Sequence, residues 1–342
     1  MNKQPKDTER WKKIVRSFSE VSVTVLADLV ADEFVFGEIA RVSREAPVLI
    51  LKHRERTVVP GGGANAVMNL AALGVNVLPV GIIGDDDIGG MLLECFREKK
   101  IPTGGIERIK GQPTTTKTRI LAGMSHNSRQ QVVRVDREAE PLSEMHPVLL
   151  NLVNAAREYA TASDGLLVSD YGYGAATPRL LTFVKSNGCL ENKPITVDSR
   201  YRILEYEGAT AATPNEPEVE EALGITIGHN TEKLNAAGER LLKDLSLESL
   251  VITRGRDGMV AFEKDAAPLM IPVYGSDHVV DVTGAGDTVI ATYTAALAAG
   301  ADTISAARLA NFAGGIVVMK RGTATVTSKE LLAAIDHSSS NL

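Results

Sequence analysis

The feature that most constrains this chain is the alternation of short apolar runs with helix-like stretches. Apolar runs occur at residues 21–27, 77–83, 165–169, 195–198, 209–213 and 250–253, with helix-like sequence between most of them. Strands joined through helices pair in parallel, because each helix returns the chain to the same end of the sheet. The sequence therefore predicts an α/β fold with a mainly parallel central sheet and helices on both faces.

Two segments interrupt this alternation with sequence that is typical of antiparallel strands. Residues 46–60 are interpreted as two short strands around a charged turn, and residues 113–137 as a hairpin with a polar turn near residues 124–128. The hairpin is rich in Thr, Val and Arg, which indicates a sheet with one face open to solvent. We expect the two insertions, about residues 38–60 and 112–137, to pair into a small separate sheet.

Composition narrows the classes of function. The 342 residues, 44% of them hydrophobic, can form one large α/β domain or two smaller ones. The net charge of −6 provides no broad basic field, so we expect no nucleic-acid partner. No apolar run approaches the roughly 18 residues of a membrane span, and the N-terminus lacks a signal-peptide core. Cys95 and Cys189 lack metal-type spacing and are expected to be reduced thiols, so we expect a cytoplasmic protein.

The glycine-rich stretch Asp281–Asp287 (DVTGAGD) precedes a helix-like run that extends to Gly300. Such a turn directs backbone N–H groups and the positive end of a helix dipole toward one point, which favours an anion. Asp287 would lie beside that anion and could accept a proton from an attacking hydroxyl. A tight strand-to-helix turn or a helix cap would also explain these residues. The pattern indicates phosphoryl transfer to an alcohol.

Several polar residues follow predicted strands. In an open parallel sheet, ligands bind at the carboxyl ends of the strands, so these residues would gather at one edge. Each of them alone is more often a cap or a turn. Their joint occurrence predicts a ligand site, formed by Asp28, Asn65, Asp170, Asp198, Asn215 and Thr253.

Asn215 and Glu218 are three residues apart at the start of a predicted helix. Amide and carboxylate oxygens suit Mg²⁺, usually through water. The same Asn-x-x-Glu spacing is also a capping box, in which the two residues satisfy backbone N–H groups. The residues alone leave both interpretations open.

Taken together, the glycine-rich turn Gly61–Asn65 and the Asp281–Asp287 motif resemble the two signature regions of the PfkB (ribokinase-like) family of carbohydrate kinases. The resemblance covers about residues 20–335. It implies a single ribokinase-like kinase domain over residues 1–342, with the two insertions as a β-sheet lid. Within the family the chain most resembles the heptose 7-phosphate kinases, through residues 41–47, 60–65, 116–119, 130–136, 169–171, 213–218 and 281–296.

The resemblance also implies roles for individual residues. Asp287 would be the catalytic base, beside an anion hole formed by the backbone of Gly284, Ala285 and Gly286. The sugar or sugar phosphate would lie near Asp28, Asp32, Gly62, Gly63, Asn65 and Asp170, with Lys117, Arg119 and Arg134 of the lid reaching a substrate phosphate. ATP would lie near Asn215, Thr253, Gly255, Gly258 and Asn311, with Mg²⁺ held through water at Glu218. Asp281 and backbone near Gly322 would form a loop for a monovalent cation such as K⁺, and the lid would form a homodimer contact.

Two positions depart from the pattern of the heptose kinases. Glu33 stands where a basic residue is usual, and Tyr173 stands where a lysine is usual. Two positive charges are therefore missing near the expected sugar site, and Arg44, Lys117 and Arg119 are the candidates to compensate. The alternatives are a PfkB kinase for another sugar, sugar phosphate or nucleoside, and a sugar- or nucleotide-binding protein without catalysis. The chain ends soon after the kinase region, so we expect it to act without the nucleotidyltransferase half of bifunctional relatives.

Overall fold

The computed structural model describes residues 4–123, 130–143, 146–275 and 280–340. Its central sheet contains β1 (Ser22–Val42), β3 (Asn76–Gly84), β4 (Gly105–Ile109), β7 (Gly165–Asp170), β8 (Ile195–Ser199), β9 (Ala211–Ala212), β10 (Ser249–Thr253), β11 (Met259–Glu263) and β12 (Leu269–Ile271). The strand order is β12-β11-β10-β9-β8-β7-β1-β3-β4. The strands β10, β9, β8, β7, β1, β3 and β4 pair in parallel with their neighbours in this order, whereas β11 and β12 are antiparallel. The prediction of a mainly parallel sheet is confirmed.

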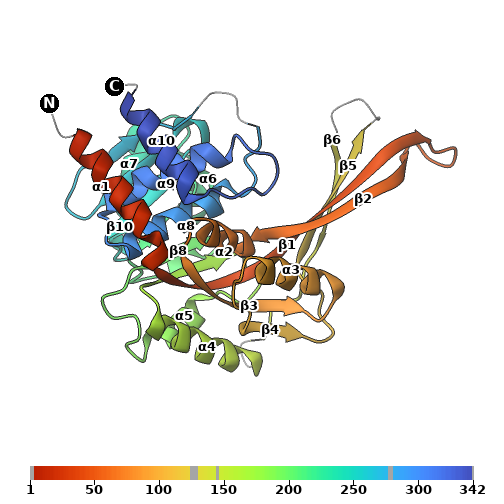
Figure 1. Ribbon diagram of the computed structural model, residues 1–342, viewed down its shortest axis with the longest axis horizontal. Coiled ribbons are helices and arrows are strands. Elements are labelled where there is room, and N and C mark those ends of the chain that lie inside the picture. Colours follow the sequence, from red (N-terminus) through yellow and green to blue (C-terminus); the bar gives the residue numbers. More distant parts are fainter. Residues whose placement is uncertain (1–3, 124–129, 144–145, 276–279, 341–342) are drawn as a thin grey trace.

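Helices cover both faces of this sheet (Figure 1). One core is formed with α1 (Gln4–Arg16), α2 (Gly63–Ala72), α3 (Asp87–Glu98), α8 (Ala285–Ala298), α9 (Thr303–Val317) and α10 (Ser328–Ser340). The other is formed with α4 (Val148–Ala162), α5 (Pro178–Lys185), α6 (Glu216–Leu223) and α7 (Thr231–Asp244). Neighbouring residues of β1 enter different cores, Val25 the first and Leu26 the second, because side chains alternate along a strand. Short 3₁₀ helices span η1 (Ser17–Glu20), η2 (Ile203–Glu205) and η3 (Gly255–Asp257).

A second sheet extends away from this body (Figure 1). It contains β2 (Leu49–Gly62), the distal part of β1, β5 (Thr116–Gly123) and β6 (Gln130–Arg137), in that order. Its pairing begins at Leu29, earlier than the expected boundary near residue 38. The prediction of two short strands within residues 46–60 is wrong, since β2 is continuous. Its charged residues 52–56 lie within the strand because this part of the second sheet is exposed.

The two sheets meet within β1. This strand pairs with β3 from Ser22 to Asp28 and with β2 from Leu29 onward. Asp28, which we expected after the end of a strand, therefore lies inside β1 where it leaves the central sheet. The expected polar turn at residues 124–128 lies outside the described residues. This junction positions the second sheet beside the carboxyl ends of the central strands.

Two expectations from composition can be compared with the structure. Cys95 and Cys189 are free thiols, as predicted, and both are partly buried. Burial raises the pKa of each thiol, which favours the protonated, unreactive form. Over the described ranges, no helix has both the length and the apolar character that crossing a membrane requires.

Candidate active site

Helix α8 begins at the predicted anion-binding turn. Its N-cap, Gly284, has φ +77°, and a Cβ added there would lie 2.4 Å from the Asn65 Nδ2 atom. Only glycine fits here, because it adopts a positive φ without strain and has no Cβ. The Ala285 N–H donates to the Val282 carbonyl (3.2 Å), so this one group is already engaged. The first N–H groups of a helix otherwise lack intrahelical acceptors, and with the helix dipole they favour an anion here.

Asp287 lies in the first turn of α8 and its side chain is held by two donors. The Asn65 Nδ2 donates to Oδ2 (2.9 Å) and the Tyr171 hydroxyl donates to Oδ1 (2.7 Å). Asn65 comes from α2 and Tyr171 follows β7, so three separate elements meet at one carboxylate. Asn69 Nδ2 in turn donates to the Asn65 Oδ1 atom (3.1 Å), which fixes the orientation of the Asn65 amide.

The environment of Asp287 favours proton transfer near neutral pH. Burial raises the pKa of its carboxyl to about 6, while the hydrogen bonds from Asn65 and Tyr171 oppose this rise. At pH 7 the group is therefore mostly ionised, yet it is basic enough to accept a proton. Burial and the nearby Asp287 charge raise the pKa of Tyr171 well above its usual range, so Tyr171 remains a donor.

A cavity of about 330 Å³ opens beside Asp287. It brings together the ends of β7, β8 and β10 with the starts of α6 and α8. This is the edge at which ligands bind in open parallel sheets. Its walls are Asp170, Tyr171, Asp198, Arg200, Thr213, Asn215, Glu218, Thr253, Val282, Gly284, Ala285, Gly286 and Asp287.

The Asp28 carboxylate accepts hydrogen bonds from the protein backbone. It is 1% exposed, and it accepts hydrogen bonds from the backbone N–H groups of Tyr171 (2.9 Å), Tyr173 (2.9 Å), Ala175 (2.8 Å) and Ala176 (3.2 Å). These bonds fix the loop that carries Tyr171. Asp28 therefore has a structural role, and its contact with a sugar stays a prediction.

Asp170 supports the same loop from the other side. Its carboxylate accepts from the Gly172 N–H, Ser199 Oγ and the Tyr206 hydroxyl, each at 2.9 Å, and it forms an ion pair with Arg202. The Asp170 side chain is 1% exposed. Although Asp170 reaches the cavity wall, all of these donors belong to the protein, and a direct sugar contact stays a prediction.

The predicted basic residues of the lid differ in their surroundings. Arg119 forms an ion pair with Asp32, and Arg134 forms one with Asp136 (2.9 Å) on an exposed strand. Lys117 places Nζ 5.5 Å from the centroid of the Tyr171 ring, beside the cavity. Burial, and after it the charge of Arg200, lower the pKa of Lys117, whereas the charges of Asp32 and Asp136 oppose this shift.

The remaining residues predicted for the sugar lie at the base of the second sheet. Asp32 is 4% exposed and also accepts from Thr323 Oγ1 (3.0 Å), so its carboxylate is satisfied by the protein. Gly62 ends β2 and Gly63 begins α2, two residues before Asn65. The turn therefore carries the chain from the lid into the helix that supports Asp287.

The residues predicted for the nucleotide are divided between two places. Thr253 lines the cavity and bridges to Asn215. Asn311 Nδ2 donates to the Pro272 carbonyl (2.9 Å), and a Cβ at Gly258 would lie 2.2 Å from the Ile271 carbonyl oxygen. Both residues thus lie against residues 271–273, and Gly255 begins η3 just before Gly258. Their contact with ATP stays a prediction.

The capping box predicted at Asn215 and Glu218 is present. The Asn215 N–H donates to Glu218 Oε2 and the Glu218 N–H donates to Asn215 Oδ1, both at 2.9 Å. Glu218 also lines the cavity together with Asp198, and burial raises the pKa of both carboxyls, that of Asp198 also through the charges of Glu218 and Asp287. This concentration of negative charge fits a hard cation such as Mg²⁺.

Protein side chains alone do not complete such a site. Over the described residues, no cluster of three or more His, Cys, Asp or Glu side chains could hold a metal. Mg²⁺ commonly binds through one or two carboxylates plus water and substrate phosphates. Asp198 and Glu218 fit that mode of binding.

The residues predicted for a monovalent cation are brought together. Asp281 Oδ1 accepts from the Thr283 N–H (2.9 Å) and Oδ2 accepts from the Gly322 N–H (3.0 Å). Partial burial alone would raise the pKa of Asp281, but these hydrogen bonds lower it below its usual value. The carboxylate is therefore ionised, and cation binding there stays a prediction.

Sequence analysis placed Asp198 in the ligand site without a specific role, and it assigned no role to Tyr171 or Arg200. Tyr171 directly follows Asp170, and it differs from an ordinary loop tyrosine only through its contact with Asp287. Asp198 follows a strand, which was its only signal in the sequence. Arg200 lies two residues further along and lines the cavity with its positive charge.

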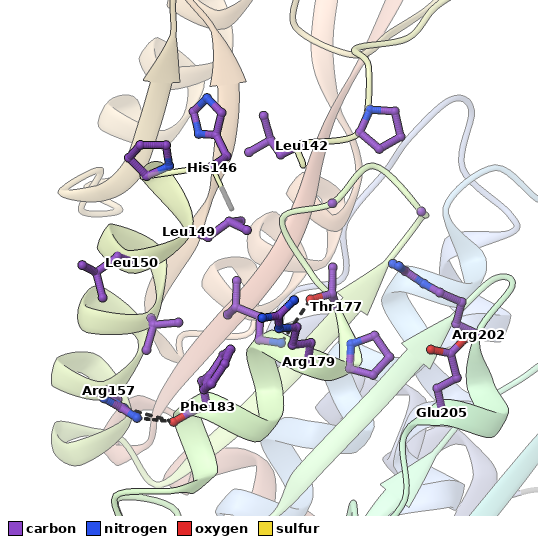
Figure 2. A pocket seen from close by; sticks show the side chains of 17 residues that line it. Leu142, His146, Leu149, Leu150, Arg157, Thr177, Arg179, Phe183, Arg202 and Glu205 are labelled. Carbon is purple, nitrogen blue, oxygen red and sulfur yellow. Dashed lines mark hydrogen bonds between the residues drawn. The ribbon is translucent and has the colours of Figure 1, made fainter. Parts of the chain in front are cut away.

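A larger cavity of about 750 Å³ lies between α4, α5 and the loop after β7 (Figure 2). Its arginines are engaged by the protein. Arg157 donates to the Phe183 carbonyl, Arg179 lies 5.6 Å from the Phe183 ring centroid, and Arg202 pairs with Asp170. Most other lining side chains are apolar. The smaller cavity beside Asp287 is therefore the candidate active site.

The chain belongs to the pfkB family of carbohydrate kinases, whose profile matches residues 30–330. It is therefore a phosphotransferase with a hydroxyl group as acceptor, and a binding protein without catalysis is not supported. The bifunctional protein HldE of Trichlorobacter lovleyi is 38% identical over 331 residues, which cover 96% of this chain and 66% of that protein. HldE of Geobacter sulfurreducens is 39% identical over 317 residues, covering 92% and 63%. The chain thus spans about two thirds of the length of these relatives.

Solved structures confirm the ribokinase-like fold. Arabidopsis thaliana ribokinase, complexed with ribose and ATP, aligns with a TM-score of 0.69 at 19% identity, covering 92% of this chain and 98% of that one. Phosphofructokinase-2 from Escherichia coli, in complex with potassium, aligns with a TM-score of 0.73 at 16% identity, covering 93% and 99%. At these identities the likeness concerns the fold alone.

Proposed function

We propose that the protein transfers the γ-phosphoryl group of ATP to a sugar hydroxyl, and that the acceptor is the anomeric hydroxyl of heptose 7-phosphate. The observation that supports phosphoryl transfer is the buried Asp287 carboxylate in the first turn of α8, beside a cavity of about 330 Å³. The likeness to HldE proteins supports a heptose as the acceptor.

In the proposed reaction Asp287 accepts the proton of the sugar hydroxyl while the oxygen–phosphorus bond forms and ADP leaves. Phosphoryl transfer needs positioning and stabilisation of charge rather than a covalent nucleophile. The N–H groups at Gly284 and Gly286 would stabilise the transferring group, since they stand at the positive end of the α8 dipole. The lid would exclude the water that otherwise hydrolyses ATP.

We propose that Mg²⁺ binds near Asp198 and Glu218, where carboxylates accumulate. When bound, this ion neutralises negative charge on the phosphates. K⁺ would bind near Asp281, whose lowered pKa keeps its carboxylate ionised. Thr253, Gly255, Gly258 and Asn311 would contact the nucleotide.

Lys117 and Arg200 are the proposed contacts for substrate phosphate. Arg200 lines the cavity, and Lys117 lies over the Tyr171 ring beside it. Of the other candidates in the lid, Arg119 is paired with Asp32 and Arg134 with Asp136.

A second acceptor class is favoured by Glu33 and Tyr173. Glu33 forms an ion pair with Arg56, and the Tyr173 hydroxyl donates to Glu138 (2.9 Å). Neither position supplies the positive charge that the heptose kinase pattern has there. A sugar without a phosphate, or a nucleoside, would need no such charge.

The acceptor can be tested by turnover of the purified protein with Mg·ATP. We expect heptose 7-phosphate to yield the 1,7-bisphosphate, detected by mass spectrometry, at a kcat/KM at least tenfold above that of the unphosphorylated heptose. Binding of a phosphate by Lys117 and Arg200 would provide this preference. Equal or better turnover of an unphosphorylated sugar or a nucleoside would reject the heptose 7-phosphate assignment and leave the kinase class intact.

We also propose a homodimer formed through the lid. Val132, Val133 and Val135 of β6 are 45%, 45% and 53% exposed, and an exposed apolar edge strand favours association. Sedimentation should give twice the chain mass of 36.5 kDa, and Val133→Glu should halve it. A monomeric wild-type protein at micromolar concentration would contradict this.

A further inference from the structure

We propose that Tyr171 is a positioning residue for Asp287, whose hydroxyl orients the carboxylate and favours its ionised form. This inference rests on the proposed role of Asp287 as the base. Tyr171 donates to Oδ1 at 2.7 Å, the shorter of the two hydrogen bonds that Asp287 receives from side chains.

The two donors to Asp287 fix the plane of its carboxylate. Tyr171 holds Oδ1 and Asn65 holds Oδ2, and the donors come from different elements of the fold. Rotation about the Cβ–Cγ bond would break both hydrogen bonds. A carboxylate has about four lone-pair sites, so each oxygen keeps one for another partner. The Asp287 carboxylate is thus held in place and still able to accept the proton of a sugar hydroxyl.

Tyr171 is itself held rigidly. Its backbone N–H donates to Asp28 Oδ2 (2.9 Å), and the next N–H, that of Gly172, donates to Asp170 Oδ1 (2.9 Å). Lys117 lies over the ring at 5.5 Å from its centroid. The buried carboxylates Asp28 and Asp170 therefore act on Asp287 through Tyr171.

The charges around Asp287 show why a donor is needed there. Three acidic side chains lie around it, namely Asp32 of β1, Asp198 of β8 and Glu218 of α6. Two basic side chains also lie there, namely Lys117 of β5 and Arg200, which follows β8. Burial and the charge of Asp32 favour the protonated form of Asp287, which cannot act as a base. A hydrogen bond to the ionised form opposes both effects.

The test compares Tyr171→Phe with Tyr293→Phe in the full chain. Tyr293 is a matched control, since it is a fully buried residue of α8 whose hydroxyl bonds Ser249 Oγ (2.7 Å). Hydrogen bonds to charged groups exceed those between neutral groups, so we expect Tyr171→Phe to lower kcat about tenfold or more. The KM for ATP should change less than about twofold. Tyr293→Phe should leave kcat and KM unchanged.

The pKa of Asp287 provides a measurement that would not change if Tyr171 only stabilised the fold. Losing a donor to the ionised carboxylate raises its pKa, so the acid limb of kcat/KM should shift upward by about one pH unit in Tyr171→Phe. ¹³C NMR of carboxyl-labelled protein without substrate should show the same shift. The Asp287 signal is identified by its loss in Asp287→Asn. Tyr293→Phe should show no shift.

The outcomes separate this inference from the acceptor assignment. An unchanged Asp287 titration in Tyr171→Phe overturns the positioning role, whatever sugar is used. A raised KM for ATP with unchanged kcat and pH profile would instead make Tyr171 a phosphate contact, which also overturns it. A wild type inactive on heptose 7-phosphate, together with a shifted Asp287 titration, rejects only the acceptor.

Discussion

Asp287→Asn should lower kcat about 10³-fold with any sugar that the wild type phosphorylates, without lowering the melting temperature Tm. General-base catalysis contributes about 10²–10⁴-fold, and asparagine cannot accept the proton of the sugar hydroxyl. The KM for ATP should stay within about twofold, because the anion-binding turn is backbone and keeps its geometry.

The expected stability of Asp287→Asn follows from the sign of the pKa shift. Burial raises the pKa of Asp287 to about 6 in the folded protein, from an ordinary 3.8. The contribution of protonated Asp287 to folding stability is thus fully present below about pH 4, and it is lost as the pH rises through about 6. At pH 7 the ionised group costs about 3 kcal/mol relative to its neutral form. Asparagine removes this cost but loses one of the two side-chain hydrogen bonds, so Tm should be unchanged or higher.

The pH profile of the wild type provides a second readout. Below about pH 6, kcat/KM should fall about tenfold per pH unit as Asp287 becomes protonated. The residual activity of Asp287→Asn should lack this acid limb, which separates Asp287 from titrating substrate phosphates. Asp244→Asn, in an exposed ion pair of α7, is the matched control and should behave as wild type. Substantial activity of Asp287→Asn would refute the base assignment.

Arg202→Met should lower the free energy of unfolding by about 3 kcal/mol. Removing one partner of a buried ion pair leaves an uncompensated charge, which typically costs about 3–5 kcal/mol. The side chain of Asp170 is 1% exposed and that of Arg202 is 28% exposed, so we expect the lower end of this range. Arg202 also donates to the Ala176 carbonyl (3.0 Å), in the loop that carries Tyr171. Thermal unfolding should show Tm lowered by roughly 4 °C.

The control for Arg202→Met is the same substitution at Arg240. Arg240 pairs with Asp244 on the surface, with 59% of its side chain exposed, and such pairs contribute only about 0.3–0.5 kcal/mol. Adding Asp170→Asn to Arg202→Met should recover part of the loss, because no buried charge is then left unpaired. Equal stability of Arg202→Met and Arg240→Met would show that the buried charge of Asp170 does not need Arg202 to compensate it.

Much of the fold could be predicted from local patterns. The alternation of apolar and helix-like runs predicts the parallel sheet, since period and turn residues depend on near neighbours. The Asn215–Glu218 capping box and the helix after Gly284 are also short-range features. The continuous strand β2 could not be predicted, because its charged residues are typical of a turn and only the exposed second sheet accommodates them.

The sequence by itself determined the fold class and the glycine-rich turn that carries Asp287, because these depend on periodicity and spacing within a few residues. The family was indicated by the resemblance of two glycine-rich motifs. The tertiary structure decided which contacts the acidic residues make within the protein. Asp28 and Asp170 hold the loop after β7, and Asp32 pairs with Arg119. The Tyr171 hydroxyl reaches Asp287 across 116 residues of sequence. Such contacts require positions accurate to a few tenths of an ångström, and only the packing of distant elements sets them.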